Sequence, residues 1–434
     1  MSFPPDLKSL IATRLDQRYR CLLRSAGKLA DRQGWKIYLV GGSVRDILLN
    51  VKSFDLDLLV EEHGLEFARR WAREEKGFYK PHKRFSTAMV IMPGGLKVDV
   101  STTRSESYLQ PGSLPEILPG SLEEDLRRRD FTINALACSL NHATFGRLID
   151  ICGGREDLSR RIIRVLHPRS FRDDPTRIFR AVRFQQRLGF TIEPRTEDWI
   201  RKAVSLKMFE QVSPERLRRE LELILQEPRP IKAIEAMACY DELRFIHPRL
   251  TFSPESKKNL QRLEENLVWF QENVFQPPGL SWRIYLGALV WSLAPLALEE
   301  VGRKFSLAHN YLRQLRSAQA GESELKAFLS ASGEISPSRI YRKLYYYQPE
   351  ILLILLSRIT SSRAQDRIRR YLLTWSKVKT EIGGKELKEL GVKPGPLFKD
   401  ILEKVLLAKM DGRVKTKEEE LVLVRSLIDK AGFD

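Results

Sequence analysis

The chain has 434 residues, of which 42% are hydrophobic and 30% are charged, and its 74 lysines and arginines exceed its 56 aspartates and glutamates to give a formal net charge of +18. This length is several times that of a typical domain and supplies enough apolar side chains for large buried cores, so we expect a folded protein of several domains. The positive excess favours an anionic partner, with nucleic acid ahead of a membrane surface.

The sequence argues against a membrane span, an export signal and a metal or redox pair of cysteines. No apolar run reaches the roughly 18 residues that a membrane-spanning helix needs, and the N-terminal segment MSFPPDLKSLIATRLDQ lacks the basic and then apolar layout of a signal peptide. The cysteines, Cys21, Cys138, Cys152 and Cys239, are scattered without a C-x-x-C pair and are expected to be reduced thiols. We therefore expect a cytoplasmic protein that does not bind membranes.

The first 155 residues combine helix and strand signals. Residues 6–33 carry apolar side chains at helical spacing. Runs of β-forming residues follow at 35–40, 54–60, 87–92, 96–101 and 146–151. A glycine turn and a short helix separate the first two runs, and Pro93-Gly94-Gly95 predicts a hairpin between the third and the fourth. Together these elements predict a small mixed sheet with helices, ending near residue 155.

From about residue 156 onward strand signals nearly vanish, and amphipathic helices are predicted one after another. They cover residues 175–188, 196–204, 214–226, 229–239, 255–272, 280–294, 308–331, 337–346, 349–358 and 364–377. The predicted fold class is therefore α+β, with a small mixed-sheet N-terminal region followed by an all-α remainder.

Two aspartates, Asp55 and Asp57, interrupt the apolar run FDLDLLV. Successive side chains of a strand alternate between its faces, so these two carboxylates are expected on the same side, a few ångströms apart. Such a pair repels itself unless a cation lies between, which favours a hard divalent ion that also accepts substrate phosphates. Asp99 in LKVDVS could supply a third ligand from a neighbouring strand. The alternative is that the two aspartates only mark a solvent-exposed face.

The segment GGSVRD lies just upstream of the aspartate pair. Gly41 and Gly42 let backbone N–H groups approach a ligand at the start of the short helix, where free donors and partial positive charge suit a triphosphate. Arg45 adds a mobile cation one helical turn further on. A Gly-Gly pair alone is usually only a turn, and its spacing from the aspartates is what favours a binding role.

A third segment, RRRDFTINALA, places three arginines before Asp130 and a predicted helix that carries Asn134. The last of these arginines, Arg129, can bind phosphate through two N–H groups, while a carboxylate can accept a ribose hydroxyl proton, so the couple fits a ribonucleotide. The alternative is a basic helix start that Asp130 caps.

A fourth segment, RSFRDDPTRIFRAVRF, begins a helix with Asp173 or Asp174 as its cap and Pro175 in its first turn. Asp174 and Arg177 lie three residues apart on one face, with Arg180 on the same stripe. They form either an ion pair worth about 0.2–0.5 kcal/mol or a reader of a base edge. In the second case the carboxylate accepts the amino proton of adenine or cytosine and the guanidinium donates to the adjacent ring nitrogen, which guanine and uracil do not match.

Taken together, these segments resemble the motif set of bacterial class II tRNA nucleotidyltransferases, the CCA-adding enzymes and their poly(A) polymerase relatives. The matching segments are GGSVRD…FDLDLLV, RRDFTINALA, DICGGREDL, DDPTRIFRAVRF and SPERLRRELELIL, in order and spacing within residues 35–226. Residues 382–421 also look like the C-terminal segment of members that act on tRNA. The base-reading motif usually begins Glu-Asp and here begins Asp173-Asp174, but Asp174 and Arg177 are kept, so nucleotide choice is expected to survive.

The resemblance implies a four-part layout that binds the acceptor and TΨC arms of tRNA. Its parts are a polymerase-beta-like catalytic head at 1–155, a helical neck with base recognition at 156–228, a helical body at 229–334 and a helical, tRNA-binding tail at 335–434.

The same resemblance implies a role for each candidate residue. Asp55 and Asp57 would hold the catalytic Mg²⁺ ions, one activating the RNA 3′-hydroxyl for attack on the α-phosphate and the other stabilising pyrophosphate. The nucleotide's phosphates and ribose would be bound by Gly41, Gly42, Arg45, Arg129, Asp130 and Asn134, and its base by Asp174 and Arg177, with Arg180 orienting that pair or touching phosphate.

Several activities stay open at this point. The long Pro- and Gly-containing segment 102–128 resembles the loop that allows a switch to adenosine, which disfavours addition of the two cytidines alone. Addition of CCA from CTP and ATP and addition of the final A remain. Poly(A) polymerases tend to carry a strongly basic C-terminal extension, whereas this chain ends plainly at LVLVRSLIDKAGFD. A non-catalytic RNA-binding protein is disfavoured because both aspartates are present.

Overall fold

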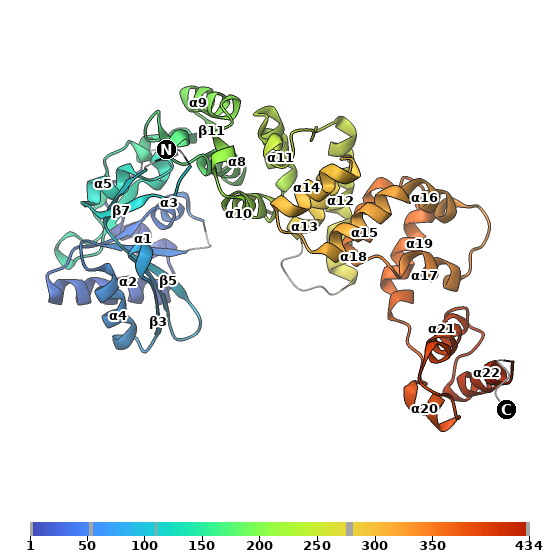
Figure 1. The fold of residues 1–434 in the computed structure, drawn as a ribbon. Coiled ribbons are helices and arrows are strands. Elements are labelled where there is room, and N and C mark those ends of the chain that lie inside the picture. Colours follow the sequence, from blue (N-terminus) through green and yellow to red (C-terminus); the bar gives the residue numbers. More distant parts are fainter. Residues whose placement is uncertain (1–2, 52–54, 109, 111, 275–280, 431–434) are drawn as a thin grey trace. The chain divides into compact units, whose positions relative to one another are not determined.

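The computed structural model describes residues 3–51, 55–108, 110, 112–274 and 281–430. The chain divides into two compact units, one formed by Met1–Ile224 and Lys232–Phe245 and the other by Leu225–Ile231 and Ile246–Asp434. Figure 1 shows a sheet with helices in the blue and green part of the chain and only helices in the yellow to red part. The predicted α+β class, with a mixed-sheet N-terminal region and a helical remainder, is confirmed.

Seven strands of the described chain form a mixed sheet in the order β3-β4-β5-β2-β1-β8-β9. They are β1 (Ile37–Val40), β2 (Leu56–Val60), β3 (Phe78–His82), β4 (Thr87–Ile91), β5 (Lys97–Thr102), β8 (Leu136–Ser139) and β9 (Leu148–Asp150). The central strand β2 runs parallel to β5 and antiparallel to β1. The predicted hairpin at 87–101 is present as β4 and β5. Phe54, with which the predicted strand 54–60 begins, lies outside the described residues.

Helices α1 (Lys8–Arg14), α2 (Gln17–Gln33), α3 (Gly42–Leu49), α4 (Gly64–Glu74) and α5 (Leu122–Arg127) accompany this sheet. The helical pattern over 6–33 therefore covers two helices rather than one. In α4, Phe67 and Trp71 are four residues apart on one face, and both are fully buried where the helix packs on β4 and β5.

The segment 102–128, expected as one long loop, holds a second hairpin in its described part. Strand β6 (Arg104–Ser107) pairs antiparallel with β7 (Glu116–Pro119), and α5 follows with a capping box between Ser121 and Glu124. Residues 109 and 111 of this segment lie outside the described residues. The hairpin was missed because its strands are four residues long and mostly polar.

Short helical elements follow the sheet. They are α6 (Gly154–Arg160), α7 (Ser170–Asp173), α8 (Thr176–Leu188), α9 (Pro194–Ser205), α10 (Pro214–Leu225) and α11 (Pro230–Cys239). One addition to the all-helical expectation is a parallel pair between β10 (Ile162–Ile163) and β11 (Thr191–Ile192). Strands of two residues are too short to produce a periodic pattern, so the sequence could not predict them.

The second unit is helical throughout its described residues. It contains α12 (Pro254–Asn273), α13 (Ser281–Val290), α14 (Pro295–Lys304), α15 (His309–Ala320), α16 (Glu322–Ser330), α17 (Pro337–Leu344), α18 (Pro349–Arg358), α19 (Ser362–Leu373), α20 (Gly384–Glu389), α21 (Pro396–Met410) and α22 (Lys417–Lys430). The single helix predicted at 308–331 is wrong, because the helix is interrupted at Gly321, which separates α15 from α16. Helices α20 to α22 share a core that includes Leu387, Ile401 and Val424.

None of the helices in the described residues combines the length and the apolarity of a membrane span. Each of the four cysteines lies in the described part of the chain and is free.

Candidate active site

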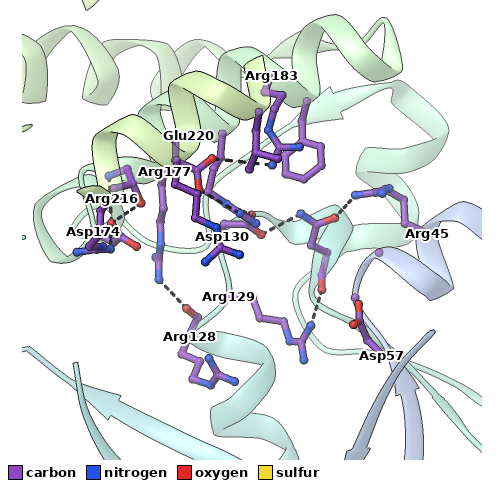
Figure 2. A pocket seen from close by; sticks show the side chains of 18 of the residues that line it. Arg45, Asp57, Arg128, Arg129, Asp130, Asp174, Arg177, Arg183, Arg216 and Glu220 are labelled. Atoms are coloured by element: carbon purple, nitrogen blue, oxygen red, sulfur yellow. Dashed lines mark hydrogen bonds and ion pairs between the residues drawn. The ribbon is translucent and has the colours of Figure 1, made fainter. Parts of the chain in front are cut away.

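A cavity of about 710 Å³ opens in the first unit, within the size range of ligand sites. Its described lining contains nine arginines against six carboxylates, an excess of positive charge that suits a polyphosphate. Figure 2 shows these side chains converging from the sheet, the loop after α5 and the helices α8 and α10. Eleven of the twelve residues predicted from the sequence line the cavity: Gly41, Gly42, Arg45, Asp55, Asp57, Arg129, Asp130, Asn134, Asp174, Arg177 and Arg180.

The aspartate pair is held by Ser43, a residue that the sequence analysis quoted but did not select. The Ser43 hydroxyl donates to the Asp55 carbonyl at 2.5 Å and accepts the Asp57 N–H at 2.9 Å. Asp57 lies on β2 between the buried side chains of Leu56 and Leu58, and Asp55 directly precedes the strand. Both aspartates line the cavity.

The two carboxylates and Asp99 interact electrostatically. The pKa of Asp57 is raised to about 6 overall, chiefly by burial, with the charges of Asp99 and Asp55 also raising it and those of Arg129 and Arg45 opposing the shift. Asp99 lies opposite Asp57 in the parallel β2–β5 register, and burial followed by the Asp55 charge raises its own pKa. Asp99 is the one predicted residue that is not part of the cavity lining.

The aspartate pair fits a divalent cation. Among the described residues no group of three or more His, Cys, Asp or Glu side chains forms a closed set of metal ligands. Mg²⁺ is, however, usually bound by one or two carboxylates together with substrate phosphates rather than by a cage of protein ligands. Asp55 and Asp57 repel each other at the edge of an arginine-rich cavity, and a cation between them would remove this repulsion.

The glycine turn before α3 is favoured by its backbone conformation and by one close approach. Gly41 has φ +64°, a left-handed conformation, and a Cβ there would lie 2.6 Å from Nη1 of Arg129. Arg45 is only 4% exposed; its guanidinium pairs with Asp46 at 2.7 Å and donates to Oδ1 of Asn134 at 2.6 Å. The expectation of a mobile cation at Arg45 is therefore wrong, because two buried partners fix the side chain.

Asp130 is the most strongly held carboxylate of the site. Oδ1 accepts the N–H of Phe131 at 2.8 Å and Nδ2 of Asn134 at 2.9 Å, and Oδ2 accepts Nη2 and Nε of Arg180 at 2.6 and 2.9 Å. Burial alone would raise its pKa, but the Arg180 charge, these hydrogen bonds and Arg177 lower the pKa to about 2. The predicted helix with Asn134 is wrong: Thr132–Asn134 is a single 3₁₀ turn before β8, and Asp130 caps no α-helix.

Asp174 and Arg177 do not form the ion pair that was the alternative to base reading. Oδ1 of Asp174 accepts the N–H and hydroxyl of Thr176 at 3.0 and 2.6 Å, at the start of α8 as predicted, and Nη2 of Arg216 at 2.8 Å. Arg177 instead donates through Nη2 to the Arg128 carbonyl at 2.7 Å. Its Nη1 is buried and has no hydrogen-bond partner among the described residues, which leaves a donor for a ligand.

Helix α10 adds residues to the site that the sequence analysis did not select. Nη1 of Arg216 donates to the Gly112 carbonyl at 3.1 Å, so one guanidinium joins Asp174 to the segment between β6 and β7. Glu220, four residues further on, lies 3.7 Å from Arg180 and 4.0 Å from Arg183. Burial raises the pKa of Glu220 while the two arginines lower it. The segment SPERLRRELELIL contains both residues at i,i+4 spacing, which was the available signal.

Two known families match parts of the chain that include residues of this cavity. Residues 37–164 match the family described as Poly A polymerase head domain, and residues 189–253 match a probable RNA and SrmB binding site of polymerase A. An A-adding tRNA nucleotidyltransferase of Geobacter sulfurreducens is 38% identical over 94% of this chain, which spans 47% of that relative. An A-adding tRNA nucleotidyltransferase of Halalkalibacterium halodurans is 32% identical over 98% of the chain and 96% of the relative.

Solved structures of similar proteins cover nearly the whole chain. An apo form of a CCA-adding enzyme superposes with a TM-score of 0.85 at 35% identity, over 98% of this chain and 99% of that one. The Thermotoga maritima CCA-adding enzyme complexed with tRNA-CCA gives a TM-score of 0.79 at 34% identity, over 98% and 99%. A CCA-adding enzyme in complex with CTP gives 0.81 at 33% identity, over 99% of each chain.

Proposed function

Because the chain belongs to the family of tRNA nucleotidyltransferases, we propose that it transfers AMP from ATP to the 3′ end of tRNA without a nucleic-acid template and releases pyrophosphate. Both relatives reported above are A-adding enzymes, which supports ATP as a substrate and a tRNA ending in CC as the acceptor. A cytoplasmic location goes with this proposal, since tRNA and nucleoside triphosphates are its substrates.

The observation that carries the proposal is the shared cavity. An aspartate pair, an arginine-rich wall and a buried guanidinium N–H without a partner line one space of about 710 Å³. Phosphoryl transfer needs little covalent chemistry from a protein beyond positioning and charge stabilisation, and this cavity supplies both.

We assign the metal to Asp55 and Asp57 and identify it as Mg²⁺. Nucleotidyltransfer enzymes generally use a divalent metal, which activates the attacking hydroxyl and neutralises charge on the leaving pyrophosphate. The two aspartates are the protein ligands in this proposal, and Ser43 holds the backbone that presents them. A third ligand from Asp99 stays a prediction that rests on its place beside Asp57 in the sheet.

The remaining side chains bind the nucleotide in this proposal. The turn at Gly41 and Gly42 binds the phosphates together with Arg129. The donor from this turn is the Gly42 N–H, because the Gly41 N–H donates to the Leu136 carbonyl at 3.0 Å. Asp130 and Asn134 bind the ribose. Asp174 accepts from the amino group of adenine, and the free Nη1 of Arg177 donates to the ring nitrogen beside it. Arg45 and Arg180 hold Asn134 and Asp130 in place.

Addition of the whole CCA end is the second candidate. The similar structure with CTP supports it, and adenine and cytosine present the same amino and ring-nitrogen pattern to Asp174 and Arg177. The relatives reported above act on tRNA by name, so the poly(A) polymerase alternative is not favoured. We further propose that the four-part layout of head (1–155), neck (156–228), body (229–334) and tail (335–434) applies, with the later parts binding the acceptor and TΨC arms.

One experiment separates these activities. The purified protein is incubated with Mg²⁺ and tRNA that ends before CCA, after C or after CC, and one labelled nucleotide is supplied at a time. Incorporation of a single A on the CC-ending tRNA alone identifies an A-adding enzyme, and C incorporation on the shorter tRNAs identifies a CCA-adding enzyme. A ladder of A residues would instead indicate poly(A) synthesis and contradict the proposal.

A further inference from the structure

Two tyrosines of the second unit form a parallel stack on one face of α17. Tyr341 and Tyr345 are four residues apart, and their ring centroids lie 5.6 Å apart with an interplanar angle of 14°. The Tyr341 ring also packs against the buried Tyr371, with 6.0 Å between the ring centroids, so Tyr341 is the inner ring of the stack. Tyr345 itself stays 61% exposed. Burial therefore explains Tyr341 but not the outer ring.

The stack borders a cavity of about 720 Å³ between α17, the segment after α19 and the start of α21. The apolar part of its lining comes mainly from α21, through Phe398, Leu402 and Leu406, each of which is half-buried. The face of α17 is tied to α21 by Ser338, whose N–H and hydroxyl donate to Asp411 at 2.9 and 2.7 Å. The two walls that carry the aromatic rings are thus fixed relative to each other.

Two lysines give this cavity an unbalanced positive charge. Lys379, in the segment after α19, and Lys399, on α21, both line it, both are exposed, and neither pairs with a carboxylate among the described residues. The acidic side chain of the lining, Glu403, lies 3.5 Å from Arg342. A flat exposed ring and two cations that share one cavity match the chemistry of a nucleobase with its flanking phosphates.

We propose that Tyr345, supported by Tyr341, stacks on an unpaired base of the RNA substrate, while Lys379 and Lys399 bind the phosphates on either side. Single-stranded or looped RNA is typically bound in this way, because unstacked bases lie on aromatic rings and cations follow the backbone. A peptide partner would match the apolar wall but would leave the two lysines without a counter-charge. This inference rests on the proposed function for the identity of the RNA as tRNA, and it adds a contact in the second unit.

The test compares tRNA affinity across a set of single variants of the full chain. The dissociation constant for labelled tRNA ending in CC is measured at several salt concentrations, alongside kcat for AMP incorporation at saturating tRNA. Tyr345→Ala is expected to weaken binding about 10-fold, in line with the loss of one stacked base, and to leave kcat unchanged. Tyr345→Phe keeps the ring and is expected to bind like the unaltered protein.

Matched variants identify the source of any effect. Tyr346→Ala removes the next exposed tyrosine, which does not line this cavity, and is expected to leave affinity unchanged. Lys379→Ala and Lys399→Ala are each expected to weaken binding. Each is also expected to reduce the slope of log affinity against log salt concentration by about 1, as for the loss of one phosphate contact. Unchanged tRNA affinity in Tyr345→Ala, or equal weakening in Tyr345→Phe, would overturn the stacking site. Failure of the proposed function would look different, because the unaltered protein would then incorporate no AMP.

Discussion

Ser43 and Asp57 are joined by a 2.9 Å hydrogen bond from the Asp57 N–H to the Ser43 hydroxyl, and the same hydroxyl donates to the Asp55 carbonyl. One buried side chain from the glycine-rich turn therefore fixes the backbone on both sides of Leu56, between the two aspartates. These two hydrogen bonds tie the glycine turn before α3 to the start of β2.

Ser43→Ala is expected to lower kcat for AMP incorporation roughly 10-fold, because it leaves two part-buried backbone groups without their partner, at a cost of about 1–3 kcal/mol. Steady-state kinetics and a thermal melt measure the two effects. Ser170→Ala is the matched control, since Ser170 is fully buried but its hydroxyl has no hydrogen-bond partner among the described residues. Equal kinetics of Ser43→Ala and the unaltered protein would contradict the positioning role.

Arg177→Ala is expected to reduce the preference for ATP over GTP and UTP, because it removes the buried Nη1 donor assigned to the base. Loss of one such hydrogen bond to a charged group corresponds to about 1.5–3 kcal/mol, or roughly 10- to 150-fold in kcat/KM for ATP. Competition between labelled nucleotides measures the preference. Arg187→Ala removes an exposed arginine of the same cavity and is expected to change affinity without changing base choice. Unaltered selectivity in Arg177→Ala would remove the base-reading proposal.

Arg216→Ala is expected to lower kcat/KM for ATP about 10-fold, since it removes the guanidinium that donates to both Asp174 and the Gly112 carbonyl. Asp174 would then lose the contact that fixes its orientation against the segment between β6 and β7. Arg219→Ala is the control, because Arg219 lies on the same helix and lines the same cavity but is exposed. If Arg216→Ala and Arg219→Ala lower kcat/KM for ATP by the same factor, the effect comes from the loss of positive charge and the orienting role of Arg216 is contradicted.

Glu242 gives a prediction about pH and stability. It is fully buried, neither carboxylate oxygen has a hydrogen-bond partner among the described residues, and burial raises its pKa well above 4.5. The folded state therefore keeps the proton to higher pH than the unfolded state does. Stability from this group is present below pH 4.5 and falls as the pH rises from there to the folded-state pKa, by about 1.4 kcal/mol per pH unit.

Glu242→Gln removes this titration. Near pH 4.5 the two proteins are expected to have similar midpoints of thermal unfolding. As the pH increases, the midpoint of Glu242→Gln is expected to rise above that of the unaltered protein. Thermal melts from pH 5 to pH 8 measure the gap. A gap that stays constant over this range would show that Glu242 does not carry the pH dependence.

Much of the site followed from sequence patterns that are local. The alternation around Asp55 and Asp57, the glycine turn and the start of α8 each depend on residues close together in the chain, and the structure has them as expected. The partners of Arg45 and Asp130 were not predictable in this way. Arg45 meets Asn134, 89 residues away, and Asp130 meets Arg180, 50 residues away. Only the folded chain brings these groups together.

The same division applies to the fold. Most of the long amphipathic helices were predicted to within a few residues because their apolar stripes repeat over several turns, but α15 and α16 were predicted as one helix and α14 was not predicted. The β6–β7 hairpin, the β10–β11 pair and the 3₁₀ turn at Thr132–Asn134 were missed, since each is two to four residues long. Helix α10 was predicted, but Arg216 and Glu220 were not selected, because Arg218 and Glu222 of the same helix have the same i,i+4 spacing. Their partners in the site, Asp174 and Arg180, are distant in the sequence.

The most direct test of the central claim is AMP incorporation into CC-ending tRNA by the double variant Asp55→Ala with Asp57→Ala, measured together with tRNA affinity. Asp55→Asn with Asp57→Asn serves as the variant of nearly equal volume, and thermal melts check that each protein folds. The account predicts that incorporation is lost in both variants while tRNA binding stays close to that of the unaltered protein. Continued incorporation by a folded double variant would contradict it.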